Sequence, residues 1–116
     1  MANQLRVTAI MQRPNTSVKF PAVTDELTTY QQVNYINTGK LVSKDTHISP
    51  DKLSKTLIST FASQADYDTY KTDDTIKTNF TARDQYCRDN NMTLNVLLQE
   101  IDSAGNALSS KVVKLV

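Results

Sequence analysis

The chain has one cysteine, Cys87, no tryptophan, two glycines and three prolines in 116 residues. A single cysteine excludes an internal disulfide and is typical of a reducing compartment. Two glycines could hardly build a glycine-rich phosphate loop or a Gly-x-Ser-x-Gly nucleophile turn, and neither motif is present. We therefore expect a cytoplasmic protein that does not cradle phosphates.

Long apolar runs and an excess of one charge are also lacking. No stretch approaches the about 20 apolar residues of a membrane span, and residues 1–6 lack the pattern of a secretion signal. Thirteen basic and twelve acidic residues are interspersed along the chain, so no broad field attracts nucleic acid or anionic membrane. With 39% hydrophobic residues, the sequence predicts one soluble globular domain over residues 1–116 that binds neither nucleic acid nor membrane.

Alternating apolar and polar residues predict the strands. The pattern has a period of two in residues 5–11 and 92–101, and residues 40–48, 53–61 and 107–116 are also rich in strand-forming residues. The alternating apolar residues expected to face the core are Leu5, Val7, Ala9, Met11, Met92, Leu94, Val96 and Leu98. Turn-forming residues precede the last segment, which we expect to pair as an edge strand.

The two middle segments are separated by Ser49–Lys52, where Pro50 presets the backbone for a tight reversal and so predicts a hairpin. A helix that begins at Ser49 with Pro50 in its first turn is the alternative. The branched side chains of Thr56, Ile58 and Thr60 disfavour that helix.

Two helical segments lie between the strands. Thr24 is a good N-cap for residues 25–36, with acidic residues in the first turn and Gly39 to end the helix. Ser63 is the N-cap of a second segment, residues 64–90, in which Asp73 predicts a break into two helices. The stripe expected to face the core in this segment is Ala65, Thr69, Thr72, Ile76, Phe80, Arg83 and Cys87.

The resulting order is β-α-β-β-α-β with a C-terminal β extension. We therefore predict an α+β, ferredoxin-like domain with a four-stranded antiparallel sheet and an additional edge strand. Helices that cover one face of such a sheet leave its second face without a protein layer.

The segment Leu57-Ile58-Ser59-Thr60-Phe61-Ala62-Ser63-Gln64-Ala65-Asp66-Tyr67 ends a strand in Phe and begins a helix at Ser. It resembles the junction of the third strand and second helix in the dimeric α+β barrel superfamily, whose familiar members are antibiotic-biosynthesis-monooxygenase-like proteins. The resemblance covers about residues 40–101 and implies a homodimer whose sheets face each other around a cavity. The small size and the Thr-, Asn- and Asp-rich composition also look like the short reading frames of large tailed bacteriophages.

The functions in that superfamily range from cofactor-free oxygenases and haem-degrading enzymes to proteins of no known activity. Several members place His or Asn in the cavity, whereas this sequence has no histidine near the matched junction. No catalytic residue is therefore carried over.

Few residues suggest chemistry of their own. His47 has no second histidine or cysteine pair with which to hold a metal, and we interpret it as an exposed hairpin residue. Cys87, on the apolar stripe four residues from Arg83, fits a buried small hydrophobe better than a reactive thiol. The tyrosines at positions 67, 70 and 86 could equally border a pocket or cover the core. The acidic residues Asp66, Asp68, Asp73 and Asp74 lack the spacing of a calcium loop and are expected to stabilise helix starts.

The second face of the predicted sheet is half apolar, and the candidate interface or cavity residues on it are Arg6, Ile10, Ile58, Asn95 and Leu97. Such a face favours burial by a second copy of the chain. The leading hypothesis is a non-enzymatic homodimeric structural or assembly protein without cofactor or metal. The alternative is a small-molecule-binding protein or a cofactor-independent monooxygenase-like enzyme with a cavity between two facing sheets.

Overall fold

The computed structural model describes residues 3–116 of the chain. The elements are β1 (Gln4–Gln12), α1 (Asp25–Gln31), the π-helical turn η1 (Gln32–Ile36), β2 (Leu41–Ile48), β3 (Ser54–Phe61), α2 (Gln64–Thr72), α3 (Asp74–Asp89), β4 (Thr93–Ile101) and β5 (Lys111–Lys114). The strands form one sheet in the order β2-β3-β1-β4-β5, with every pair antiparallel. The predicted α+β class is confirmed, and the strand order is compatible with a ferredoxin-like fold extended by β5.

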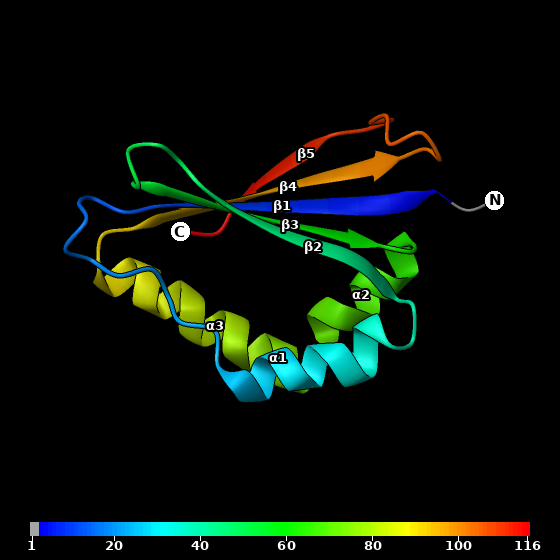
Figure 1. Ribbon diagram of the computed structural model, residues 1–116, viewed down its shortest axis with the longest axis horizontal. Coiled ribbons are helices and arrows are strands. Elements are labelled where there is room, and N and C mark those ends of the chain that lie inside the picture. The colour runs from blue at the N-terminus through cyan, green and yellow to red at the C-terminus, as the bar shows by residue number, and fades with distance from the viewer. Residues whose placement is uncertain (1–2) are drawn as a thin grey trace.

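The helices lie on one side of the sheet, and no element of residues 3–116 covers the other side (Figure 1). We call the two sides the inner face, toward the helices, and the outer face. The register follows the predicted alternation, because Leu5 pairs with Phe61 on the inner face and Ile10 pairs with Thr56 and Asn95 on the outer face. The hairpin prediction is confirmed, and β1 lies at the centre of the sheet because β3 and β4 pair with its two edges.

The helix boundaries follow the expected capping residues. The Thr24 hydroxyl accepts a hydrogen bond from the backbone N–H of Leu27 at 3.1 Å, and the Ser63 hydroxyl does the same for Asp66 at 3.1 Å. Gly39 has a φ of +79° and donates its N–H to the carbonyl of Ile36 at 3.0 Å. The first helical segment thus ends at a glycine in the left-handed conformation, which residues with side chains rarely adopt.

The predicted break at Asp73 is confirmed, and its carboxylate makes four hydrogen bonds there. One oxygen accepts from the backbone N–H groups of Thr75 and Ile76 at 2.9 and 3.3 Å, so it caps α3. The other accepts from the hydroxyls of Tyr30 and Tyr35 at 2.7 and 2.6 Å. We call this set the Asp73 cluster. It joins α1 and η1 to the junction of α2 and α3.

The predicted stripe is right for α3 and wrong for α2. In α3, Ile76 and Cys87 are fully buried. In α2, Tyr70 is buried and Tyr67 half-buried, whereas the predicted residues Ala65, Thr69 and Thr72 are exposed. The prediction continued a single helical phase through residue 73, but the extended backbone of Asp73 resets that phase.

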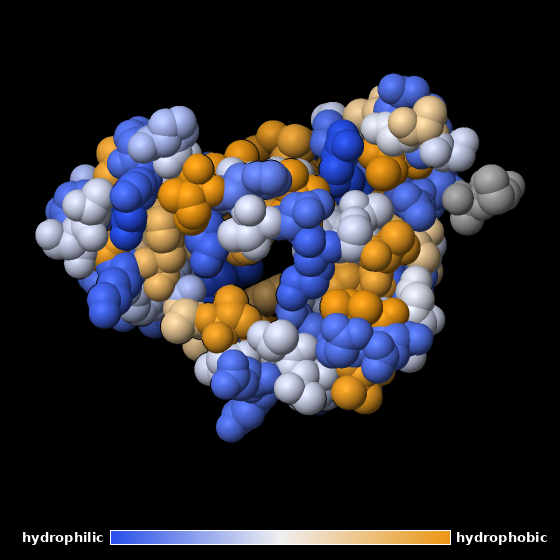
Figure 2. Space-filling view, in the orientation of Figure 1, coloured by the Kyte–Doolittle hydropathy of each residue, from blue (hydrophilic) through white to orange (hydrophobic). Residues whose placement is uncertain are grey.

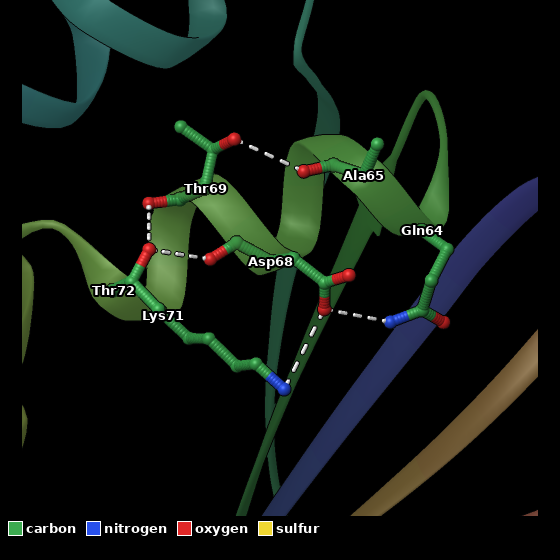
Figure 3. Close-up of polar contacts among 6 residues, drawn as sticks. All are labelled: Gln64, Ala65, Asp68, Thr69, Lys71 and Thr72. Atoms are coloured by element: carbon green, nitrogen blue, oxygen red, sulfur yellow. Dashed lines mark hydrogen bonds and ion pairs between the residues drawn. The ribbon is translucent and has the colours of Figure 1, made fainter.

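On the exposed side of α2, polar side chains form hydrogen bonds and an ion pair within the helix itself (Figure 3). The Thr69 hydroxyl donates to the Ala65 carbonyl at 3.1 Å, and the Thr72 hydroxyl donates to the Asp68 carbonyl at 2.8 Å. The Asp68 carboxylate accepts from Gln64 at 3.0 Å and pairs with Lys71 at 3.5 Å. Threonine hydroxyls that bond the preceding turn are compatible with a solvent-facing position.

The last strand pairs with β4 as predicted but is shorter than the predicted residues 107–116. Ala107 makes an isolated bridge to Ile101, and regular pairing begins only at Lys111. Between them the Ser109 hydroxyl accepts the N–H of Glu100 at 3.4 Å. A side-chain acceptor there takes the place of a backbone ladder bond.

The buried residues form two clusters at opposite ends of the inner face. The first cluster contains Leu5, Leu27, Tyr35, Leu41, Phe61, Tyr70 and Ile76. The second cluster contains Ala9, Met11, Cys87, Met92, Leu94 and Val96. Val7 is half-buried and packs against both clusters. Side chains near the middle of the sheet, such as Leu57 and Ser59, are only half-buried.

Two substitutions of Asp73 should distinguish the stability that comes from its helix cap from the stability that comes from its charge. We expect Asp73→Ala to lower the free energy of unfolding by about 2 kcal/mol, because it removes an N-cap and two charge-assisted hydrogen bonds. Asp73→Asn keeps a capping oxygen and should cost about 1 kcal/mol. Urea unfolding at neutral pH measures both values, and Asp74→Asn, in the exposed first turn of α3, is the control with a change within about 0.5 kcal/mol.

The same variants predict a pH dependence. Burial by itself would raise the pKa of the Asp73 carboxyl, but hydrogen bonds from Tyr35, Tyr30 and two backbone N–H groups outweigh it and lower the pKa below 3.8. A lowered pKa contributes stability at neutral pH that is lost as the pH falls below about 4. Asp73→Asn should therefore lose less stability than the wild type between neutral and acidic pH. Equal acid sensitivity of the two proteins would contradict this role of Asp73.

Candidate functional site

A cavity of about 620 Å³ separates the inner face of the sheet from the helices. We call it the inter-layer cavity. Figure 2 shows a hollow between the sheet and the helical layer, bordered by both hydrophilic and hydrophobic residues. Its sheet side is lined by Val7, Ala9, Met11, Leu57, Ser59 and Val96. Its helical side includes Leu27, Gln31, Tyr67, Tyr70 and Phe80.

Two features of the sequence leave this space open. On the sheet side, Ala9 and Ser59 are small residues that fill little of the space below the central strands. On the helical side, the Asp73 cluster binds α1 and η1 to the α2–α3 junction. Helix α1 is therefore held against other helices, and the gap between it and the sheet persists.

An aromatic wall closes the cavity toward the first core cluster. The Phe61 ring centroid lies 5.0 Å from that of Tyr70 and 5.2 Å from that of Tyr67. The Phe80 ring lies 5.7 Å from that of Tyr70 and the Tyr35 ring 4.8 Å from it, both in edge arrangements. Tilted and edge-on contacts of this kind are favoured over face-to-face stacking and give the wall a defined shape.

A chain of three polar side chains crosses the cavity from the sheet to the helices. The Lys44 ammonium on β2 donates to the Gln31 side-chain oxygen at 2.7 Å, and the Gln31 amide nitrogen donates to the Tyr70 hydroxyl at 2.6 Å. Gln31 is 6% exposed and is the buried polar residue of the described chain. Burial lowers the pKa of Lys44 and raises the pKa of Tyr70 to about 12. Two hydrogen bonds thus join an amine, an amide and a phenol in one chain.

Sequence reasoning missed Gln31 and Lys44, although a signal for Gln31 exists. Leu27, Gln31 and Tyr35 are spaced by four and share one helical face, and the first and last are buried. A glutamine within an apolar stripe is a buried polar group that needs partners. Lys44 lies on an edge strand in which every residue after the buried Leu41 is exposed, Lys44 included, so its sequence pattern carries no such signal.

The predicted interface residues Arg6, Ile10, Ile58, Asn95 and Leu97 share the outer face and do not line the inter-layer cavity. Ile10 is 36% exposed, and Ile58 and Leu97 are half-buried. Arg6 donates twice to the Gln99 side-chain oxygen, at 3.1 and 3.0 Å. The cavity expected between two facing sheets would lie on this outer face and stays a prediction.

The remaining candidates have structural surroundings. His47 is exposed on β2, and in residues 3–116 no three histidine, cysteine or acidic side chains come together to hold a metal ion. Asp66 accepts from the Ser63 hydroxyl at 2.9 Å in the cap of α2. Of the tyrosines, Tyr67 and Tyr70 line the cavity, and Tyr86 also lines it while donating to the Lys19 carbonyl at 2.5 Å. No helix of the described chain is long and apolar enough to cross a membrane.

Comparison with known proteins identifies no family. No family model matches the sequence, and no curated protein matches it. A search of solved structures finds a phage SAM lyase in complex with S-methyl-5'-thioadenosine, at 10% identity and a TM-score of 0.28, over 95% of this chain and 89% of that chain. At this TM-score the likeness supports no inference about fold, ligand or source. The resemblance to the dimeric α+β barrel superfamily stays a prediction.

The thiol of Cys87 should be unreactive in the folded protein. Its side chain is fully buried in the second core cluster, and burial raises its pKa. We expect a thiol reagent such as dithionitrobenzoate to react at least about 100-fold more slowly in buffer than in denaturant, because access requires unfolding. Absorbance at the dye's maximum follows the reaction, and Cys87→Ser supplies the blank. Comparable rates in buffer and denaturant would show that the thiol is accessible.

Proposed function

We propose that this protein binds a small, mostly apolar molecule in the inter-layer cavity. The observation that carries this proposal is the cavity itself, whose volume of about 620 Å³ lies in the range of ligand sites, about 300–1,000 Å³. The sheet side of the cavity, which we call its floor, is mostly aliphatic, and its wall is aromatic. The polar groups that line it include those of Lys44, Gln31 and Tyr70. Apolar lining with few polar groups is the usual composition of such sites.

The support is for binding and not for a reaction. The described residues of the cavity include no histidine and no cysteine, and the hydroxyl of Tyr70 has a raised pKa that keeps it protonated. Among the described residues, no hydrogen bond joins a serine or threonine hydroxyl of the cavity to a basic side chain, since Lys44 donates to Gln31. Binding, transport or sensing of a ligand therefore accounts for the geometry without a catalytic constellation.

A variant with a filled cavity tests the proposal. Its binding is measured with N-phenylnaphthylamine, a neutral dye that fluoresces in apolar sites. Ser59 lies on the cavity floor, and Ser59→Phe should lower the affinity for the dye at least about tenfold because the ring occupies the site. The matched control is Thr60→Phe, one residue further on β3 and on the outer face. It should bind the dye as the wild type does. Equal binding by both variants, or no saturable binding by the wild type, would overturn the proposal.

We also propose that two copies associate through the outer face, the homodimer that the sequence predicts. The face has an aliphatic centre made of Ile10, Ile58 and Leu97, and Val112 of β5 extends it at 69% exposure. Its two edges have opposite charge, with Asp45 on β2 and Lys114 on β5. A two-fold axis parallel to the strands places β2 of one copy over β5 of the other, so the apolar centres meet and the charges attract.

Sedimentation tests the dimer. We expect the wild type to sediment at twice the chain mass of 13.0 kDa, and Ile58→Lys to sediment as a monomer because it places two charges in the aliphatic centre. Val33→Lys, on the exposed side of η1 at 55% exposure, is the control that should leave the mass unchanged. A wild type that stays monomeric at millimolar concentration would refute the dimer and leave the cavity proposal unaffected.

A further inference from the structure

The charged side chains that line the inter-layer cavity are almost all cationic. They are Lys44, Lys55, Lys71, Lys77, Arg83 and Asp84. Two of these cations are neutralised, since Lys71 pairs with Asp68 at 3.5 Å and Arg83 pairs with Asp84 at 3.1 Å. Within residues 3–116, no carboxylate lies within 4.0 Å of the other three ammonium groups. The cavity therefore carries a local positive charge in a chain whose net charge is only +1.

Lys44 differs from the other two in how its ammonium group is held. Lys55 lies 5.9 Å from the Phe20 ring, and Lys77 makes no side-chain hydrogen bond in the described chain. Lys44 donates to Gln31, whose position is fixed in turn by its hydrogen bond to the buried Tyr70. An ammonium has three donors, and Gln31 accepts from one of them. The remaining donors of Lys44 are available to a ligand at a position set by the protein.

The position of Lys44 also suits a ligand with one polar end. Its ammonium lies at the edge strand of the sheet, while the aliphatic floor and the aromatic wall extend away from it toward β1 and α3. Lys44 is exposed by surface area, but partial desolvation of its ammonium lowers its pKa, so an anion placed against it would favour the charged form. A neutral ligand would leave the ammonium without an opposite charge.

We propose that the ligand of the inter-layer cavity is an amphipathic anion, with a single carboxylate or other oxyanion bound by Lys44 and an apolar body enclosed by the floor and wall. This rests on the proposed function, because it specifies what the same cavity binds. Gln31 is a positioning residue that directs the ammonium and need not touch the ligand itself. Lys55 and Lys77 add to the local field without fixing a contact.

Two dyes that differ by one sulfonate group test the proposal. Anilinonaphthalene sulfonate is N-phenylnaphthylamine with an added sulfonate, so their comparison isolates the anion. We expect Lys44→Met, which keeps an unbranched side chain but removes the charge, to lower the affinity for the sulfonated dye about tenfold and to change that for the neutral dye less than about twofold. Lys44→Arg should retain most of the affinity for the sulfonated dye. The control Lys111→Met, on exposed β5 outside the cavity, should leave both affinities unchanged.

Competition then identifies the head group. Octanoate should displace the sulfonated dye from the wild type, whereas octanamide and octylamine, with the same tail, should displace it at least about tenfold less effectively. Near-ultraviolet circular dichroism and cooperative thermal unfolding confirm that each variant is folded, which excludes dye binding to a loosened core. Displacement by octanamide equal to that by octanoate, or equal loss of both dyes in Lys44→Met, would overturn the inference while cavity binding stands. If neither dye binds the wild type, the proposed function itself fails.

Discussion

The carboxylate of Asp73 is the constraint on which the arrangement of the helices depends. One of its oxygens caps α3, and the other holds two tyrosine hydroxyls from the first helical segment. A charged acceptor with four donors is a stronger joint than neutral contacts provide, because charge-assisted hydrogen bonds are about twice as strong. The burial of the carboxylate would otherwise disfavour its charge, and these donors reverse that effect. The helical segments are therefore joined to one another by hydrogen bonds that do not involve the sheet.

This arrangement explains why the inner face has two cores with a cavity between them. The first cluster packs near the Asp73 cluster, and the second packs where α3 runs into β4. Between them the floor is made of small and half-buried residues, and α1 is held to the other helices. Gln31 spans the gap with both ends of its amide paired, as a buried polar group requires. The gap that leaves the core incomplete thus contains the hydrogen-bonded chain from Lys44 through Gln31 to Tyr70.

The proposed ligand site and the proposed dimer interface lie on opposite faces of the sheet. The inner face, covered by helices, encloses the cavity and its cations, and the outer face combines an aliphatic centre with edges of opposite charge. Because adjacent residues of a strand point to opposite faces, one strand contributes to both, as Ser59 and Thr60 of β3 do. The proposed ligand binding and the proposed self-association can accordingly be tested one at a time.

The sequence by itself determined the element order, the hairpin, the caps at Thr24 and Ser63 and the break at Asp73, because strand alternation and capping are local properties read over a few residues. It also placed Ile10, Ile58 and Leu97 on one face, since strand parity follows directly from position. The tertiary structure alone decided that α2 buries Tyr70. The extended backbone of Asp73 changes the direction of the chain between α2 and α3, and the spacing of apolar residues does not predict that change. The tertiary structure alone also brought Lys44 to Gln31, since these residues meet only across the space between the edge strand and α1, and a volume left unfilled between layers leaves no pattern in the chain.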